Sequence, residues 1–258
     1  MNVFLAGAAA AFGVMIVTWL ISLPARDASL ADIAWGLVFV SVAWAVYAAG
    51  ERSSASLLVA ILVSVWGLRL SGYLAWRNLG HGEDRRYQAM RAKRPQSFWL
   101  WSLVGVFCLQ AAIGWFVSLP VQSLGAASDP ASVLSWIGVA GFLIGIIFEA
   151  VGDAQLAAFK RDPANAGKVM DRGLWRFTRH PNYFGDAVVW WSLWLVAVGA
   201  GGAWWTFVGP ALMTLFLVRV SGAALLESDI AERRPEYASY IERTSSFVPW
   251  PPKRSSRG

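Results

Sequence analysis

The sequence is short of charge. Asp, Glu, Lys and Arg together make up only 15% of its 258 residues, whereas an average soluble domain has about 25%. Hydrophobic residues reach 57%, and 16 residues are tryptophan. So little polar surface excludes a water-soluble enzyme, and so much apolar character excludes a disordered chain.

Cysteine, histidine and the common nucleotide-binding motifs are also scarce or absent. The single Cys108 excludes an internal disulfide and a cysteine metal site. His81 and His180 are the only histidines, and His-Glu-x-x-His is missing, so we expect no metal site. Neither Gly-x-Gly-x-x-Gly nor the P-loop motif occurs, which excludes a Rossmann or P-loop nucleotide site.

The charges that are present avoid seven long apolar stretches. Each stretch is close to the roughly 20 residues that cross a bilayer as a helix. Together they hold six of the 38 charged residues. We therefore predict an all-α integral membrane protein with seven transmembrane helices, forming a single domain over residues 1–252 with a frayed tail over residues 253–258. The predicted spans are 3–24, 30–50, 55–76, 98–120, 132–159, 183–200 and 203–226.

The basic residues indicate the orientation of these spans. Nineteen of the 22 Lys and Arg residues fall on one side of the seven predicted spans, and Arg52 alone falls on the other. The positive-inside rule then places the N-terminus outside and the C-terminus in the cytoplasm. We expect a multi-pass protein of the bacterial inner membrane, in contact with membrane lipid. The same bias explains most of the net charge of +6 without a nucleic acid, and no obligate protein partner is evident.

Charged residues inside the predicted spans are candidates for function, because an ionised side chain at mid-bilayer costs at least a few kcal/mol. They gather toward the cytoplasmic half, which favours a polar cavity open to the cytoplasm. The alternative is that they sit at helix ends and reach water, and this is strongest for Asp186. Gly141 and Gly145 have the small-xxx-small spacing of close helix packing. The six charged residues are Asp32, Arg69, Glu149, Asp153, Asp186 and Arg219.

The most informative motif is Gly173–Asp186, where a basic loop meets the start of a predicted span. Arg176, Arg179 and His180 flank a helix N-terminus, which is a favourable place for an anion. The alternative is a basic loop next to the membrane, with Asn182 as the helix cap.

Residues 179–186, Arg-His-Pro-Asn-Tyr-Phe-Gly-Asp, resemble the motif of membrane steroid 5α-reductases and their bacterial relatives. Residues 66–87 and the tail 227–250 are similar to the bacterial branch of that family, and the resemblance covers about residues 28–252. The Arg-His-Pro-x-Tyr core also occurs in sterol C14-reductases and isoprenylcysteine carboxyl methyltransferases, so the core by itself does not determine the chemistry.

The resemblance implies a seven-helix reductase that binds NADPH without a Rossmann domain. By motif, Asn182, Tyr183 and Asp186 hold the nicotinamide and its ribose. Basic residues hold the phosphates, since the planar guanidinium of Arg can donate two hydrogen bonds to one phosphate. The implied cofactor contacts are Arg69, Arg85, Tyr87, Asp153, Lys160, Arg161, Arg172, Arg179, His180, Asn182, Tyr183, Asp186, Arg219, Glu227 and Tyr237.

The implied reaction is reduction of the C4–C5 double bond of a 3-oxo-Δ4 steroid, or of a related enone lipid. The family has a Gln-Glu pair on one span and a Tyr on the next, whereas this chain has Ala31-Asp32 and Trp66. We expect catalysis by Asp32 beside Trp66, with Tyr73 in place of the missing Tyr. Two alternatives stay open: an S-adenosylmethionine-dependent lipid or prenyl-cysteine methyltransferase, and a non-catalytic sterol-binding protein.

Overall fold

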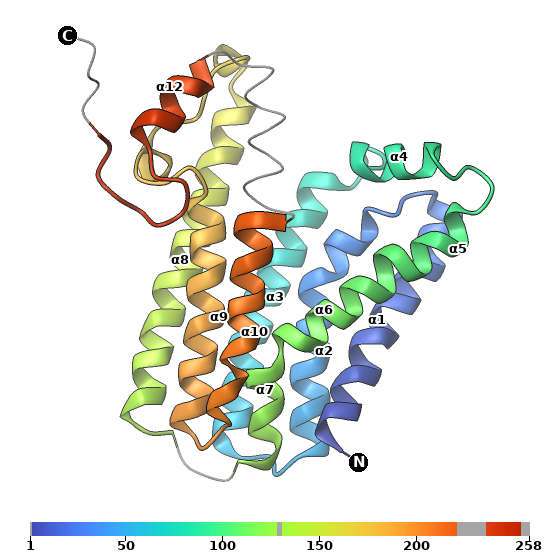
Figure 1. The fold of residues 1–258 in the computed structure, drawn as a ribbon, viewed down its shortest axis with the longest axis vertical. Coiled ribbons are helices and arrows are strands. Elements are labelled where there is room, and N and C mark those ends of the chain that lie inside the picture. Colours follow the sequence, from blue (N-terminus) through green and yellow to red (C-terminus); the bar gives the residue numbers. More distant parts are fainter. Residues whose placement is uncertain (1, 128–130, 221–235, 254–258) are drawn as a thin grey trace. The chain divides into compact units, whose positions relative to one another are not determined.

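The computed structural model describes residues 2–127, 131–220 and 236–253, and these residues form helices joined by turns (Figure 1). The first three long helices are α1 (Val3–Ala25), α2 (Leu30–Ala49) and α3 (Ser54–Asn78). The short helix α4 (Arg85–Ala92) leads into a fourth long helix, made of α5 (Phe98–Ser102), a π-helical stretch (Leu103–Cys108) and α6 (Leu109–Val117). The remaining helices are α7 (Leu119–Ser123), α8 (Val133–Arg161), α9 (Pro181–Gly199), α10 (Val208–Leu215) and α12 (Glu236–Arg243).

Five helices of the described part are long and apolar enough to cross a bilayer. They are α1, α2, α3, the fourth long helix Phe98–Val117, and α8. The chain is therefore an integral, multi-pass membrane protein, as predicted. The sixth predicted span coincides with α9, and the seventh with the shorter apolar stretch Trp204–Arg219 and with residues outside the described ranges. Seven spans and their orientation stay predictions.

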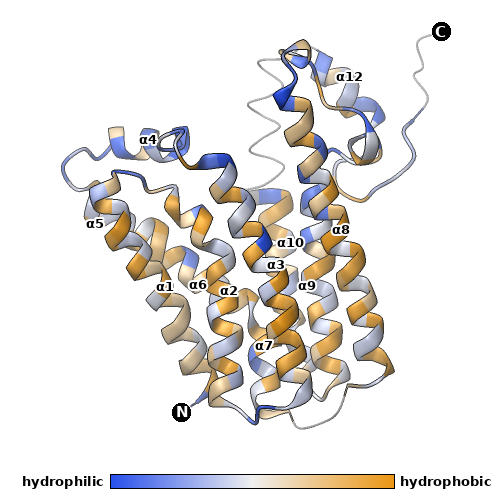
Figure 2. Ribbon diagram, turned by 180° about the vertical axis from the view of Figure 1, so that it is seen from behind, coloured by the Kyte–Doolittle hydropathy of each residue, from blue (hydrophilic) through white to orange (hydrophobic). Residues whose placement is uncertain are grey.

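Polar side chains fix where the helices begin. The Asn2 side chain accepts a hydrogen bond from the Phe4 N–H at the start of α1, and Asp84 accepts one from the Arg86 N–H at the start of α4, both at 2.9 Å. Each cap satisfies a backbone donor that has no partner within the helix. Figure 2 shows the consequence of the sequence pattern: the long helices are mostly hydrophobic, and α4 and α12 are mostly hydrophilic.

The chain divides into two compact units. The first contains Met1–Trp136 and Trp194–Gly209, and the second contains Ile137–Leu193 and Pro210–Gly258. In the first unit, α2 and α3 cross at two glycines: a Cβ on Gly36 would lie 2.2 Å from the Gly67 carbonyl oxygen. Alanine and valine side chains fill the core between α1, α2 and the fourth helix, because small side chains let helices approach closely.

The second unit repeats this close packing between α8 and α9. A Cβ on Gly145 would lie 2.8 Å from the Gly185 carbonyl oxygen, and one on Gly141 would lie 2.5 Å from the Ser192 hydroxyl. The structure therefore confirms that the Gly141–Gly145 step is a packing surface. The prediction of a single domain over residues 1–252 stays untested, because the two units are defined separately.

Candidate functional site

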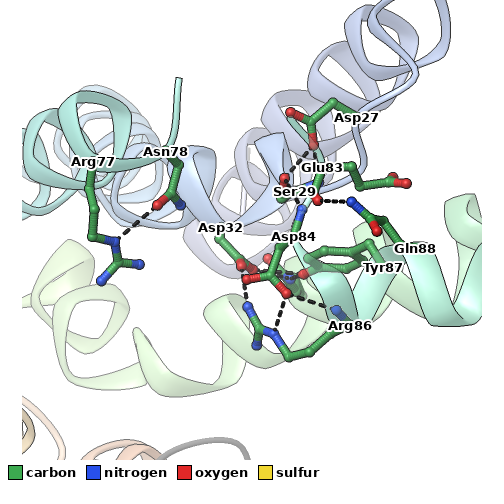
Figure 3. Close-up of polar contacts among 11 residues, drawn as sticks. Asp27, Ser29, Asp32, Arg77, Asn78, Glu83, Asp84, Arg86, Tyr87 and Gln88 are labelled. Atoms are coloured by element: carbon green, nitrogen blue, oxygen red, sulfur yellow. Dashed lines mark hydrogen bonds and ion pairs between the residues drawn. The ribbon is translucent and has the colours of Figure 1, made fainter. Parts of the chain in front are cut away.

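The first candidate site surrounds Asp32, which lies in the first turn of α2. The Tyr87 hydroxyl donates to Asp32 Oδ1 at 2.7 Å, and Arg86 Nη2 donates to Asp32 Oδ2 at 2.8 Å (Figure 3). Gln110 Nε2, from α6, lies 3.5 Å from Asp32 Oδ1 and 3.4 Å from the Tyr87 hydroxyl. We call Asp32, Arg86, Tyr87 and Gln110 the Asp32 cluster.

Contacts at both ends of α4 hold this helix against the α1–α2 turn. Gly80 and Gly82, with φ of 83° and 76°, make the sharp turn from α3 toward α4. Glu83 then accepts hydrogen bonds from the Ala28 N–H at 2.8 Å and from Arg91 at 2.7 and 2.9 Å. These contacts from both ends of α4 place Tyr87 over Asp32.

The electrostatics of the cluster keep the Tyr87 phenol neutral. Burial, and then the negative charge of Asp32, raise the pKa of the Tyr87 hydroxyl well above its ordinary value. Burial by itself would lower the pKa of Arg86, but the charge of Asp32 and the hydrogen bond and charge of Asp84 together outweigh it and raise that pKa. A neutral phenol and an ion-paired carboxylate therefore lie side by side, so Tyr87 keeps its hydrogen and can donate it in a hydrogen bond.

Trp66 and Tyr73, the other two residues predicted to be catalytic, have different surroundings. Trp66 is fully buried, and its ring packs edge-on against Phe39 at 5.3 Å. The guanidinium groups of Arg69 and Arg77 each lie 5.7 Å from the centroid of the Tyr73 ring. The hydroxyl that touches Asp32 belongs to Tyr87, which the resemblance had given to the cofactor.

The second candidate site lies where α8 meets the start of α9. Asn182 Nδ2 donates to Asp153 Oδ1 at 3.1 Å, and Asp153 is 5% exposed. The His180 ring stacks on Tyr183 at 5.5 Å with an interplanar angle of 7°. We call Asp153, His180, Asn182 and Tyr183 the α8–α9 polar site. The structure thus brings together four of the implied cofactor contacts: three from the motif and Asp153 from α8.

The basic loop before α9 is fastened to the C-terminal segment. Arg179 Nη1 donates to the backbone carbonyl oxygens of Thr244 and Ile241 at 2.8 and 3.2 Å, and Arg179 is only 8% exposed. The Tyr240 hydroxyl donates to the Trp175 carbonyl oxygen, and burial raises the pKa of Tyr240. These bonds give Arg179 a structural task in holding the loop, in addition to the phosphate contact predicted for it.

A basic cavity lies beside this loop. Its volume is about 460 Å³. Lys168, Arg172 and Arg243 contribute three cations to its lining, against the carboxylates of Asp171 and Glu236. Arg243 Nη2 is bound to Asp171 Oδ2 at 2.6 Å. The lining of the cavity therefore carries one more positive than negative charge, and it includes one predicted cofactor residue, Arg172.

The remaining predicted cofactor residues have various positions. Lys160 and Arg161 end α8, Tyr237 is buried in α12, and Asp186 is buried in α9. Arg85 is exposed at the start of α4, and Arg219 lies in the helical stretch Phe216–Val220. Glu227 lies outside the described residues. The metal prediction stays as it was: within the described ranges no group of His, Cys, Asp and Glu has a metal-binding arrangement.

Sequence reasoning missed Arg86 and Gln110 in the first site, and Lys168 and Arg243 in the basic cavity. A signal existed for Gln110, because it is the one amide within the apolar run 98–117, and polar side chains in spans usually face other protein groups. Arg86 had no such signal, because it lies among several similar basic residues.

Comparison with known proteins shows the family of the chain. A family model described as "Protein of unknown function (DUF1295)" matches residues 18–244. The chain belongs to the DUF1295 family. A relative in Schizosaccharomyces pombe, described as an uncharacterized protein, is 24% identical over 281 residues, which cover 96% of this chain and 80% of the relative. No solved structure matches the chain. The matched range of this DUF1295 protein includes both candidate sites.

Proposed function

We propose that this DUF1295 protein is an NADPH-dependent reductase of the steroid 5α-reductase type. In this proposal it has seven spans, with the N-terminus outside and the C-terminus in the cytoplasm, and reduces the C4–C5 double bond of a 3-oxo-Δ4 steroid or a related enone lipid. The observation that carries the proposal is the Tyr87–Asp32 hydrogen bond of 2.7 Å, with Gln110 beside it. An acid held on a carboxylate is what polarisation of an enone carbonyl requires.

The α8–α9 polar site and the basic cavity are suited to the cofactor. The Asn182 amide offers a donor and an acceptor, which matches the carboxamide of nicotinamide. The net positive lining of the cavity, with Arg172 beside the ion-paired Arg243, suits a phosphate group. When bound, NADPH supplies a hydride to the β-carbon of the enone.

The Asp32 cluster would deal with the oxygen of the substrate. Hydride addition at the β-carbon moves electrons through the double bond onto the carbonyl oxygen and leaves an enolate. The neutral Tyr87 hydroxyl turns its hydrogen bond from Asp32 to that oxygen. Arg86, which stays paired with Asp32 and lies 5.5 Å from the centroid of the Tyr87 ring, holds the phenol in place. A proton from solvent then reaches the α-carbon, so that the saturated ketone forms. The proposal thus gives the donor role to Tyr87 and a positioning role to Asp32.

The experiment uses the purified protein in detergent. Thermal-shift titration should show stabilisation by NADPH and NADP, and none by S-adenosylhomocysteine. Incubation with NADPH and progesterone should then give the 5α-dihydro product by mass spectrometry. Stabilisation by S-adenosylhomocysteine alone would favour the methyltransferase, and nucleotide binding without turnover of any enone would favour a non-catalytic sterol-binding protein.

A further inference from the structure

A second basic surface lies at the opposite end of α4 from Gly80 and Gly82. From residue 85 to residue 97 the chain has five basic residues and no acidic one. Two of them are already neutralised: Arg86 forms salt bridges with Asp32 and Asp84, and Arg91 forms one with Glu83. This leaves Arg85 at the start of the helix, and a pair of cations after its end.

That pair is Lys93 and Arg94. Lys93 is exposed, and in the described part of the chain neither residue forms a salt bridge. The Arg94 guanidinium lies 4.4 Å from the centroid of the Trp101 ring, which fixes its position at the start of the fourth long helix. Two positive charges therefore stay available where a membrane-spanning helix begins.

Large apolar side chains lie next to these cations. Trp99 and Leu100 are 53% and 51% exposed in the first turn of the fourth helix. Trp19 of α1 stacks on Trp99 at 6.5 Å and donates from its indole N–H to the Trp99 carbonyl oxygen at 2.9 Å. Exposed tryptophans at the end of a span are typical of the boundary between headgroups and acyl chains.

We propose that Lys93, Arg94, Trp99 and Leu100 form a binding site for the headgroup and upper acyl chains of an anionic phospholipid. The two cations match the phosphate in charge, and the apolar pair extends the surface into the acyl region. Because the fourth span begins at Phe98, both cations lie within the reach of lipid headgroups. An anionic surface attracts each nearby Lys or Arg enough to strengthen binding about fivefold.

The site would act on α4 as well as on the lipid. Lys93 directly follows the last residue of α4, and α4 carries Tyr87. A lipid bound at Lys93 and Arg94 would steady the C-terminal end of this short helix in addition to the Glu83–Arg91 ion pair. This consequence does not depend on the reductase proposal, since it concerns the order of α4 and not its chemistry.

Native mass spectrometry of the full chain tests the site. The protein is released from nanodiscs of phosphatidylglycerol or phosphatidylcholine, and bound lipid is counted. We expect retention of phosphatidylglycerol over phosphatidylcholine, and a loss of about 25-fold in Lys93→Gln/Arg94→Gln, from two contributions of about fivefold. The control Arg26→Gln/Arg52→Gln removes the same charge from exposed positions outside the site and should retain the lipid.

Hydrogen exchange gives a second measurement. Amides of residues 85–92 should exchange more slowly in phosphatidylglycerol than in phosphatidylcholine nanodiscs, and the difference should vanish in the double variant. Equal retention of both lipids, or wild-type retention by the folded double variant, would overturn the proposal. Displacement of the lipid by NADPH would overturn it too, because Lys93 and Arg94 would then serve the nucleotide.

Discussion

The hydrogen bond between Asn182 and Asp153 allows a test that separates folding from cofactor binding. Asn182→Asp replaces the amide donor by a second carboxylate at the same position, 3.1 Å from Asp153 Oδ1. Asp would serve as well as Asn as a helix cap, so sequence reasoning predicts an intact fold and an NADPH affinity at least tenfold lower, about 1.4 kcal/mol. The structure changes the first half of that prediction.

The magnitude follows from two contributions. The lost hydrogen bond to a charged acceptor is worth about 1.5–3 kcal/mol. Repulsion between the carboxylates adds to this, up to the cost of protonating one of them, which is about 4 kcal/mol at pH 7 for an ordinary carboxyl. A protonated carboxyl can donate the lost hydrogen bond again. The total destabilisation therefore cannot exceed the cost of protonating one carboxylate. We therefore expect a destabilisation of about 2–4 kcal/mol at pH 7, which shrinks as the pH falls toward 5.

The assay is thermal unfolding in detergent together with NADPH titration. Asn182→Asp should lower Tm by about 5–15 °C, since 1 kcal/mol moves Tm by roughly 2–4 °C in a chain of this size. The exchange variant Asp153→Asn/Asn182→Asp puts the carboxylate and the amide back opposite each other and should recover most of the Tm. It should still bind NADPH weakly, because position 182 lacks the amide donor.

Either of two results would refute this reasoning. A wild-type Tm for Asn182→Asp would mean that Asp153 and Asn182 do not interact in solution. Recovery of both Tm and NADPH affinity in the exchange variant would mean that Asn182 supports the fold and makes no contact with nicotinamide.

Three further predictions concern the first unit. Tyr87→Phe should lower kcat/KM for the enone about 10²–10³-fold with NADPH stabilisation unchanged, whereas the control Tyr47→Phe should keep wild-type turnover; equal rates for the two would exclude Tyr87 as the donor. Burial raises the pKa of Glu83, but the hydrogen bonds from Arg91 and Ala28 outweigh it and hold the pKa below its usual range, so its stabilising effect is present above about pH 4.5 and is lost as pH falls through the lowered value. Hydrogen exchange of α4 should accelerate in that acidic window in the wild type, and Glu83→Gln should show fast exchange at neutral pH already. Gly36→Val should abolish folding of the first unit, seen as loss of the cooperative unfolding transition, because its Cβ would meet the Gly67 oxygen at 2.2 Å.

The positions of the long apolar helices are the part of the fold that the sequence predicts well. Five of the seven predicted spans coincide with long apolar helices, because about 20 apolar residues in a row have few other stable arrangements. Sequence could not predict the division into two units. The division depends on which helix faces pack together. Close glycine contacts, such as that of Gly36 with Gly67, cannot be predicted from the sequence, because a glycine does not indicate which helix it packs against.

The candidate site was predictable where its residues are close in sequence. His180, Asn182 and Tyr183 lie within one turn of a helix, so a motif could join them. The other members of the Asp32 cluster lie 54 to 78 positions from Asp32, and only the packing of α4 and α6 near the start of α2 brings them together. For that reason no sequence pattern indicates the contact between Tyr87 and Asp32, and the catalytic role expected of Tyr73 stays a prediction.

The charged residues in the spans differ in the partners that offset their charge. Asp153 is compensated by Asn182, and Arg69 lies over Tyr73. Local partners of this kind offset part of the cost of a charge near the bilayer, so a charge in a span is by itself weak support for an active site. Asp32 differs because its two closest partners, Arg86 and Tyr87, lie on α4, a short helix outside the spans, and because its side chain remains 24% exposed. A carboxylate that is open to solvent, and whose charge is balanced by a separate element, can change its partner when a ligand arrives. On this argument the Asp32 cluster, more than any other charged position of the first unit, is the place to look for chemistry.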